Sequence, residues 1–412
     1  MHLLLRLTFL MLPLKAFGAY SNYNSVVIGQ EAAGFGGAYT ALSGDASAVA
    51  FYNPASMARM KGSSLSASAS AFQKFDTQYG DENNFLIAPT RVNKGFFEPV
   101  PSAAGSVVTY QDFSFGFSIL IPDFNTFSGE IESSTNATSF LSQSDQTLWV
   151  GGSFALNLSP STSVGVSLYY TARKFQRSLS DQLKNGTDVE ATIEEKNFTQ
   201  NSVVFILGLY HQLTSNWSAG LSLRLPSIPI SGSGTFFRSD LDTNPDTFSE
   251  FTKTDLLSAT KIPLKLALGI AYQKTKHYSV DLDVSFYGRE RYEDVDLSSS
   301  ADLIEHEPVV NFAIGGEYCF RPWLTGRTGF FTNFSSHPKI TAADTQRRGD
   351  HLNMLGTAAN LTFHTSVNTR FTFGGYWTGG RGESIQQIGQ NLSAIGKSVQ
   401  IFTMVVGTSY QF

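Results

Sequence analysis

Large apolar and small residues alternate with a period of two over much of the chain, and this pattern constrains the fold more than any other feature. From Phe113 to Ile119 every second residue is large and apolar, and the residues between are Ser or Gly. Such alternation gives a β-strand two faces that meet different media. Further runs of this type occupy residues 148–156, 164–170, 203–209, 217–225, 264–272, 278–286 and 402–412. The chain is therefore predicted to be all-β.

The connections between these runs alternate in length. Short turns are predicted near residues 110–112, 158–161, 214–216, 273–277, 320–323 and 364–368. Long polar loops are predicted at residues 76–103, 124–143, 176–198, 226–261, 287–308, 334–350 and 380–397. Six short and seven long connections join fourteen strands. Short turns on one side and long loops on the other are typical of outer-membrane barrels.

A closed sheet follows from the same reasoning, because an open edge in lipid would leave backbone groups without hydrogen-bond partners. The prediction is a 14-stranded antiparallel transmembrane β-barrel over residues 63–412. A soluble β-sandwich also contains alternating strands, but it does not predict a regular alternation of short and long connections.

Composition is consistent with strands that meet lipid on one face and water on the other. Charged residues make up 15% of the 412 residues and aromatic residues 13%. A mean hydropathy of -0.08 is too polar for a bundle of membrane helices. The formal net charge of -5 argues against a nucleic-acid partner.

Residues 1–18 are predicted to be a secretory signal peptide. Arg6 precedes an apolar core over residues 7–14, and small residues follow at residues 16–18. The core is too short to span a bilayer. Cleavage is expected near Gly18 or Ala19, so the mature chain is expected to be exported.

Residues 19–62 are rich in Gly, Ala and Ser and do not alternate. Ser43 or Asp45 is predicted to cap a short helix, and Asn53 a second one with Pro54 at its first position. A fourteen-stranded barrel has a lumen that side chains alone cannot fill. This segment is therefore predicted to fold into the lumen as a mostly helical hatch.

The stretch GFGGAYTALSGDASAVAFYNPASM, residues 34–57, resembles the hatch of the FadL family of outer-membrane long-chain fatty acid transporters and their aromatic-hydrocarbon relatives. Residues 262–272 and 312–331 are similar to strands of that family. The resemblance covers nearly the whole mature chain. It departs at Ser56, where the family often has Gly or Leu, and the long loops do not align, so the ligand-binding residues stay unassigned.

The resemblance implies passive transport of long-chain fatty acids or similar hydrophobic solutes, gated by the hatch, with lateral exit into the membrane. The hydrophobic solute and outer-membrane lipid are thus the expected partners. The hatch and gating residues carried over from the motif are Gly34, Gly37, Asp45, Ser47, Asn53, Pro54 and Ala55. For the Asn53-Pro54-Ala55 corner, a helix cap without a gating role is the alternative.

The last strand ends in Tyr410 and Phe412, which is similar to the aromatic-terminated strand of barrels inserted by the outer-membrane assembly machinery. That machinery is a further expected partner. Aromatic residues in the long loops either contact the solute or pack within the loops; these are Phe236, Phe237 and Phe251.

Neither an enzyme nor a metal or cofactor site is expected. The seven histidines are scattered without metal-ligand spacing, and nothing marks a partner serine for His211 or His364. Cys319 is the single cysteine and is expected to serve packing. The alternative function is a FadL-like barrel that acts as a secretion or surface-assembly partner and binds proteins. A general diffusion porin is disfavoured by the hatch.

Overall fold

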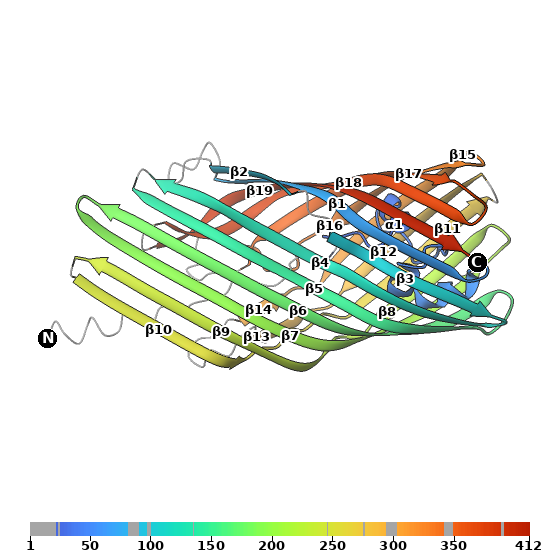
Figure 1. Ribbon diagram of the computed structural model, residues 1–412, viewed down its shortest axis with the longest axis horizontal. Helices are drawn as coiled ribbons and strands as arrows, with labels where there is room; N and C mark the ends of the chain where they lie inside the picture. Colours follow the sequence, from blue (N-terminus) through green and yellow to red (C-terminus); the bar gives the residue numbers. More distant parts are fainter. Residues whose placement is uncertain are drawn as a thin grey trace.

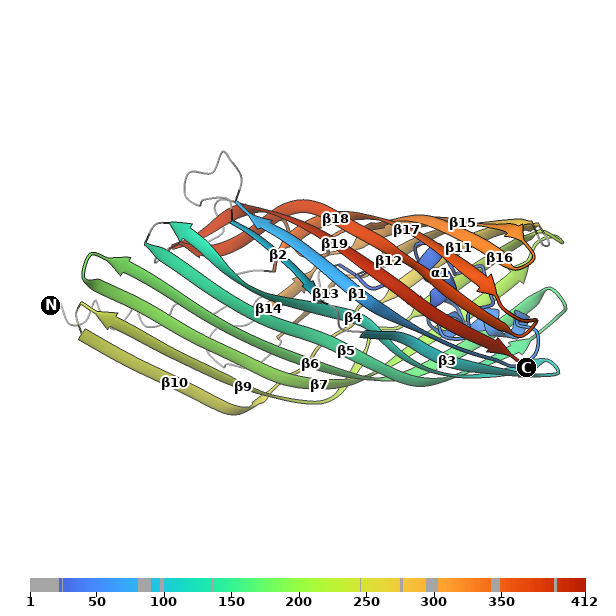
Figure 2. The ribbon, with the colours of Figure 1, turned by 45° about the horizontal axis from the view of Figure 1, so that its top comes forward.

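The computed structural model describes residues 22–23, 25–80, 90–96, 100–134, 136–244, 246–274, 277–293, 303–341, 349–388 and 391–412. The predicted signal peptide, residues 1–18, lies outside them. The chain forms an elongated barrel whose strands are strongly tilted, with the N-terminal helical segment near one end (Figure 1). Figure 2 shows from a second direction that this segment lies at the end where the C-terminus and the short turns are found.

One antiparallel sheet makes up the barrel wall. Its strands are β1 (Ser64–Tyr79), β2 (Thr90–Phe96), β3 (Val100–Tyr110), β4 (Phe113–Ser134), β5 (Ala137–Asn157), β6 (Thr162–Asn185), β7 (Asp188–Gln212), β8 (Trp217–Arg224), β9 (Ile228–Thr243), β10 (Asp246–Leu257), β11 (Lys265–Lys274), β12 (Tyr278–Tyr287), β15 (Val309–Arg321), β16 (Leu324–Asn333), β17 (His351–His364), β18 (Thr369–Ile388) and β19 (Asn391–Gln411).

These segments count as fourteen barrel strands, because three strands are interrupted. β2 and β3 both pair with β1, β8 and β9 both pair with β7, and β10 and β11 continue the next strand. The first and last strands close the sheet by pairing from Ser64–Gln411 to Tyr79–Lys397, with one irregularity between Ser70 and Phe72. The prediction of a closed 14-stranded barrel is confirmed.

All six short turns lie where they were predicted. The seven long connections are partly wrong, because β4, β5, β6, β7, β9, β10, β18 and β19 continue through much of the stretches assigned to loops. There the hairpins extend past the rest of the barrel (Figure 1), so both faces can be polar and the apolar alternation disappears. The stretch at residues 287–308 instead holds a small separate sheet of β13 (Glu290–Glu293) and β14 (Leu303–His306).

The outer face of the wall is apolar over the middle of the barrel. Phe115 and Phe117 on β4 expose 55% and 51% of their surface, whereas Ser114 and Ser118 on either side of them face inward and are buried. This is the arrangement of a lipid-facing strand with a polar lumen side. In the part of the chain that the structure describes, no helix is both long and apolar enough to cross a membrane.

The hatch comprises the described residues up to 62. It contains α1 (Gln30–Gly34), α2 (Val49–Tyr52) and the 3₁₀-helix η1 (Pro54–Arg59), joined by turns. Its buried side chains, among them Ile28, Phe35 and Leu42, pack against inward residues of the wall in one hydrophobic cluster. The predicted cap of the first short helix is wrong: α2 begins after Ala48, without a side-chain cap.

Candidate functional site

The Asn53-Pro54-Ala55 corner joins the hatch to the barrel wall. Asn53 is fully buried and caps η1, since its Oδ1 accepts a hydrogen bond from the Ala55 N–H at 3.1 Å. Its Nδ2 donates to the Thr40 carbonyl at 2.8 Å and to the Leu209 carbonyl of β7 at 3.0 Å. One side chain thus fixes the helix start, a second hatch turn and a barrel strand.

The wall lies so close to this corner that only glycine fits opposite it. A Cβ at Gly208 would lie 2.2 Å from Asn53 Oδ1, and one at Gly165 would lie 2.5 Å from the Pro54 carbonyl carbon. Other wall glycines lie equally close to hatch atoms; they are Gly105, Gly220, Gly269, Gly315, Gly329 and Gly407. We call these eight residues the hatch-facing glycines. In the sequence they stand within strands, where glycine is a signal of close backbone approach.

Asp45 and Ser47 form a second attachment. Asp45 is fully buried, and its carboxylate accepts from the Ser47 Oγ, the Ser66 Oγ of β1 and the Glu31 N–H at 2.6, 3.0 and 2.9 Å. Burial and the neighbouring Glu31 raise the pKa of Asp45, although these hydrogen bonds oppose the shift. The Ser47 N–H also donates to Ser66 Oγ at 2.7 Å.

Gly34 and Gly37 allow α1 to end where it does and to lie close to the barrel wall. Gly37 has a left-handed backbone with φ of 84°, and its N–H closes the helix on the Ala32 carbonyl at 2.9 Å. A Cβ at Gly34 would lie 2.3 Å from the Asn360 side chain. Asn360 on β17 donates to the Gln30 carbonyl at 2.7 Å. The structure thus places all seven predicted hatch residues in the hatch, at or next to its contacts with the wall.

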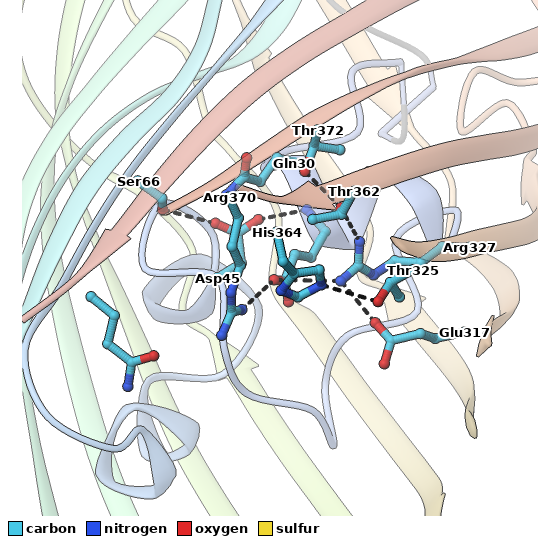
Figure 3. A network of polar contacts seen from close by, with 12 residues as sticks. Gln30, Asp45, Ser66, Glu317, Thr325, Arg327, Thr362, His364, Arg370 and Thr372 are labelled. Atoms are coloured by element: carbon cyan, nitrogen blue, oxygen red, sulfur yellow. Dashed lines mark hydrogen bonds and ion pairs between the residues drawn. The ribbon is translucent and has the colours of Figure 1, made fainter. Parts of the chain in front are cut away.

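A charged network that the sequence did not reveal fixes α1 (Figure 3). Glu31 on α1 lies 3.5 Å from Arg327 on β16 and 3.2 Å from Arg370 on β18. Arg327 also pairs with Glu317 on β15 at 2.7 Å. Burial disfavours the Glu31 carboxylate, but the two guanidinium groups outweigh this effect and lower its pKa.

Cavities continue from the hatch toward the long hairpins. An outer cavity of about 170 Å³ is lined by the side chains of Asn22, Tyr79, Phe124, Leu141, His337 and Met354, among others. An inner cavity of about 50 Å³ is lined by Tyr23, Phe51, Pro122, Trp149, Arg224 and His306, among others. A third, of about 40 Å³, shares Tyr23, Phe51, Pro122 and Arg224 and reaches Gly36 and Gly37 of the hatch. Ligand pockets are usually larger than these, so the lumen is closed in this conformation.

Arg224 is the most unusual residue of the inner cavity. It is 8% exposed, and its guanidinium carbon lies 5.9 Å from the Trp149 ring centre and 5.8 Å from that of Tyr287. Among the described residues it forms no ion pair, although Asp123, which lines the same cavity, interacts with it electrostatically. Its hydrogen bond from Nη2 to the Pro263 carbonyl is 3.5 Å long, and its Nε has no partner in the described part of the chain.

The wall is interrupted beside this cavity. β3 pairs with β4 from Tyr110–Phe113 to Ala103–Leu120, and the described pairing between them ends there although β4 continues to Ser134. On its other side β4 is irregular in its pairing with β5 between Leu120 and Asp123. Pro122, which has no N–H to donate, lies at this break and lines the inner cavity.

The other residues singled out from the sequence lie elsewhere. Phe236 is buried on β9 against Phe175 and Phe198, so it packs within the wall rather than in a loop. Phe237 on β9 and Phe251 on β10 are likewise strand residues, and none of the three lines the described cavities. His211 is exposed and His364 contacts Thr325.

The single cysteine and the C-terminal aromatic residues also have defined places in the structure. Cys319 is half-buried near the end of β15, where its Sγ donates to the Arg321 carbonyl. Tyr410 and Phe412 contact each other through their rings, 4.8 Å apart, and expose 41% and 73% of their surface. Their recognition by the assembly machinery stays a prediction.

Several solved structures share this fold. A Pseudomonas aeruginosa FadL homologue is 13% identical with a TM-score of 0.67, and the match covers 95% of this chain and 100% of that one. The P. putida toluene transporter TodX is 13% identical with a TM-score of 0.66, covering 95% and 99% of the two chains. The Ralstonia pickettii toluene transporter TbuX is 14% identical with a TM-score of 0.57, covering 93% and 98%. No curated protein matches the chain.

At these identities the structures establish the fold alone. The family assignment comes from the sequence. The sequence model of the outer membrane protein transport proteins (OMPP1/FadL/TodX) matches residues 24–342. With its closed barrel, its internal hatch and this match over most of its length, the chain belongs to the OMPP1/FadL/TodX family of outer-membrane transport proteins for hydrophobic compounds.

Proposed function

We propose that this protein carries long-chain fatty acids, or other hydrophobic solutes with an anionic headgroup, across the outer membrane by passive diffusion. The observation that carries the proposal is Arg224, a buried cation that forms no ion pair among the described residues; Asp123, which lines the same cavity, interacts with it electrostatically without an ion-pair contact. A buried charge is costly unless it is paired. A carboxylate ligand would supply the missing partner and accept two parallel hydrogen bonds from the guanidinium group.

The surroundings of Arg224 suit the rest of such a molecule. Phe51, Trp149 and Ile262 line the inner cavity and offer apolar surface for an acyl chain. Each buried methylene group contributes about 0.8 kcal/mol. Lys265 lies 5.5 Å from the Tyr287 ring centre in the adjoining cavity and adds a second positive charge. A neutral hydrocarbon would gain the apolar contacts but would leave Arg224 unpaired.

The route begins at the outer cavity and ends at the wall break. Phe124 lines the outer cavity and Pro122 the inner one, so β4 follows the route along its length. The described pairing between β3 and β4 ends at the same level, so the wall can open sideways here with little loss of hydrogen bonds between these two strands. We infer lateral exit into the membrane at Pro122, with the hatch closing the way to the periplasm.

Uptake by cells that lack their own importer tests the role of Arg224. With equal barrel amounts in the outer membrane, Arg224→Gln should raise the oleate concentration needed for half-maximal uptake by about 10- to 150-fold, since a hydrogen bond to a charged group contributes about 1.5 to 3 kcal/mol. Toluene uptake should not fall. Arg238→Gln, which removes a partly exposed charge on β9, is the matched control and should behave like the wild type.

Two results would contradict the proposal. Unchanged oleate uptake in the Arg224→Gln variant would show that the headgroup does not meet this residue. An equal loss for oleate and toluene would show that the substitution damages the channel rather than the recognition of charge. Oleate uptake that does not depend on the wild-type protein at all would remove the fatty acid function and favour other apolar solutes.

A further inference from the structure

The connection between β12 and β15 meets the connection between β16 and β17 inside the barrel. The Glu307 N–H donates to the Ser336 carbonyl at 2.6 Å, and His306 Nδ1 lies 2.8 Å from Ser336 Oγ. The rings of His306 and His337 touch edge to face, with centres 5.1 Å apart and planes at 84°. His306, Ser336 and His337 are at most 4% exposed, so the two connections are firmly packed together here.

The first described residues of the chain complete this contact. Tyr23 stacks on Tyr287 with ring centres 4.5 Å apart, and its ring centre lies 5.9 Å from that of His306. Asn22 donates from Nδ2 to the carbonyls of Asn333 and Leu352 at 2.7 and 2.8 Å. We call Asn22, Tyr23, His306, Ser336 and His337 the septum.

The septum divides the lumen. Asn22 and His337 line the outer cavity, whereas their neighbours Tyr23 and His306 line the inner one. The partition is thus about one side chain thick, and it lies on the outer side of Arg224, away from the hatch-facing glycines. A solute that passes from the outer to the inner cavity at this contact has to separate these side chains.

We propose that the septum is a second gate, distinct from the hatch, and that protonation of His306 opens it. Four side chains that ionise face His306: Tyr23, Tyr292 of β13, His337 and Arg173 of β6. Arg173 is paired with Asp145 at 2.7 Å, and His351 lies behind His337, with Nδ1 2.6 Å from its carbonyl oxygen. No described carboxylate hydrogen-bonds His306, and Arg173 already places a positive charge near it. Three further charged groups line the same inner cavity, namely Asp123, Arg224 and Lys261.

The direction of the pH response follows from this environment. Burial, His337 and Arg173 together hold the pKa of His306 well below its ordinary value of about 6.5. In an open septum the imidazole would meet water and regain that ordinary pKa. The closed state therefore binds fewer protons, and its advantage is lost as the pH falls through about 6.5. Between pH 7.5 and pH 5.5 the open fraction should rise about tenfold for one histidine.

Thiol accessibility measures septum opening without any hydrophobic substrate, so its result is independent of the proposed fatty acid specificity. In a Cys319→Ser background, Thr171→Cys places a thiol in the inner cavity and Gln143→Cys places one in the outer cavity. Intact cells are treated with a charged maleimide that does not cross the membrane. The ratio of inner to outer labelling rates reports passage through the septum.

With the septum intact, the ratio should be low at pH 7.5 and rise about tenfold at pH 5.5. His306→Gln keeps a polar group toward Ser336 but cannot become charged, so its ratio should stay low at both pH values. His306→Ala and Ser336→Ala should raise the ratio already at pH 7.5. His211→Gln, which changes an exposed histidine, should respond like the parent and controls for the pH dependence of the thiols.

A ratio that rises as much in His306→Gln as in His211→Gln would overturn the role of protonation. A ratio that is already near one at pH 7.5 in the parent, or that neither alanine variant increases, would overturn the septum as a barrier. The Ser336→Ala variant keeps the barrier testable if His306→Ala does not insert correctly.

Discussion

Asn53→Ala tests how firmly the hatch is held in the barrel. The substitution removes three hydrogen bonds of a fully buried side chain, to the Ala55 N–H and to the carbonyls of Thr40 and Leu209. At about 0.5 to 1.5 kcal/mol each, the loss is about 1.5 to 4.5 kcal/mol. The population in which the hatch is undocked and unfolded should therefore increase by roughly 10- to 2,000-fold.

Hydrogen exchange followed by mass spectrometry measures this population, because buried hatch amides exchange when the hatch leaves the wall. Peptides from residues 28–52 should exchange faster by the same factor, while peptides from β15 to β17 keep their wild-type rates. Asn368→Ala, at an exposed turn, should change neither. Unchanged hatch exchange in a correctly inserted Asn53→Ala barrel would refute the view that this corner holds the hatch, and leave Asn53 as a helix cap only.

Two further substitutions test the charged network and the lateral exit. Since Arg327 and Arg370 lower the pKa of Glu31, docking of the hatch should weaken as the pH falls below about 4.5. Glu31→Gln should weaken docking already at pH 7 and should not weaken it further in acid, as measured by hatch exchange rates corrected for the intrinsic effect of pH on exchange. An identical pH profile in both proteins would contradict this role of Glu31. Pro122→Ile supplies the missing N–H at the wall break and should lower oleate uptake severalfold at equal barrel amounts, whereas Pro160→Ala at a short turn should not. Full uptake by Pro122→Ile would place the exit elsewhere.

The strands and short turns could be predicted because lipid imposes a strict rule on one face of each strand. Phe113 to Ile119 alternate for this reason, and the turn after Tyr110 interrupts the pattern where the chain leaves the membrane. The hairpins beyond the membrane do not contact lipid, so their strands need not alternate apolar and polar residues. Residues 176–198 have polar side chains on both faces, so the sequence predicts a loop there, although β6 and β7 pair as far as Asn185 and Asp188.

The site was predictable where it is local in sequence. Asn53-Pro54-Ala55 was identified because a cap and its helix are adjacent, and the structure confirms the cap. Arg224 carries no such signal, since its isolation depends on Trp149, Pro263 and Tyr287 from three other parts of the chain. The pairing of His306 with His337 likewise depends on how two connections fold inward, which strand periodicity does not encode.

The hatch also bears on how the barrel is assembled. β1 and β19 are the two ends of the wall and meet only when the sheet closes. The hatch contacts both, through Asp45 with Ser66 of β1 and through Gln30, which lies against Gly407 of β19. Its complete fit therefore exists only after closure, and its contacts in turn stabilise the seam between the first and last strands. A barrel that loses its hatch should open at this seam more easily than elsewhere along its circumference.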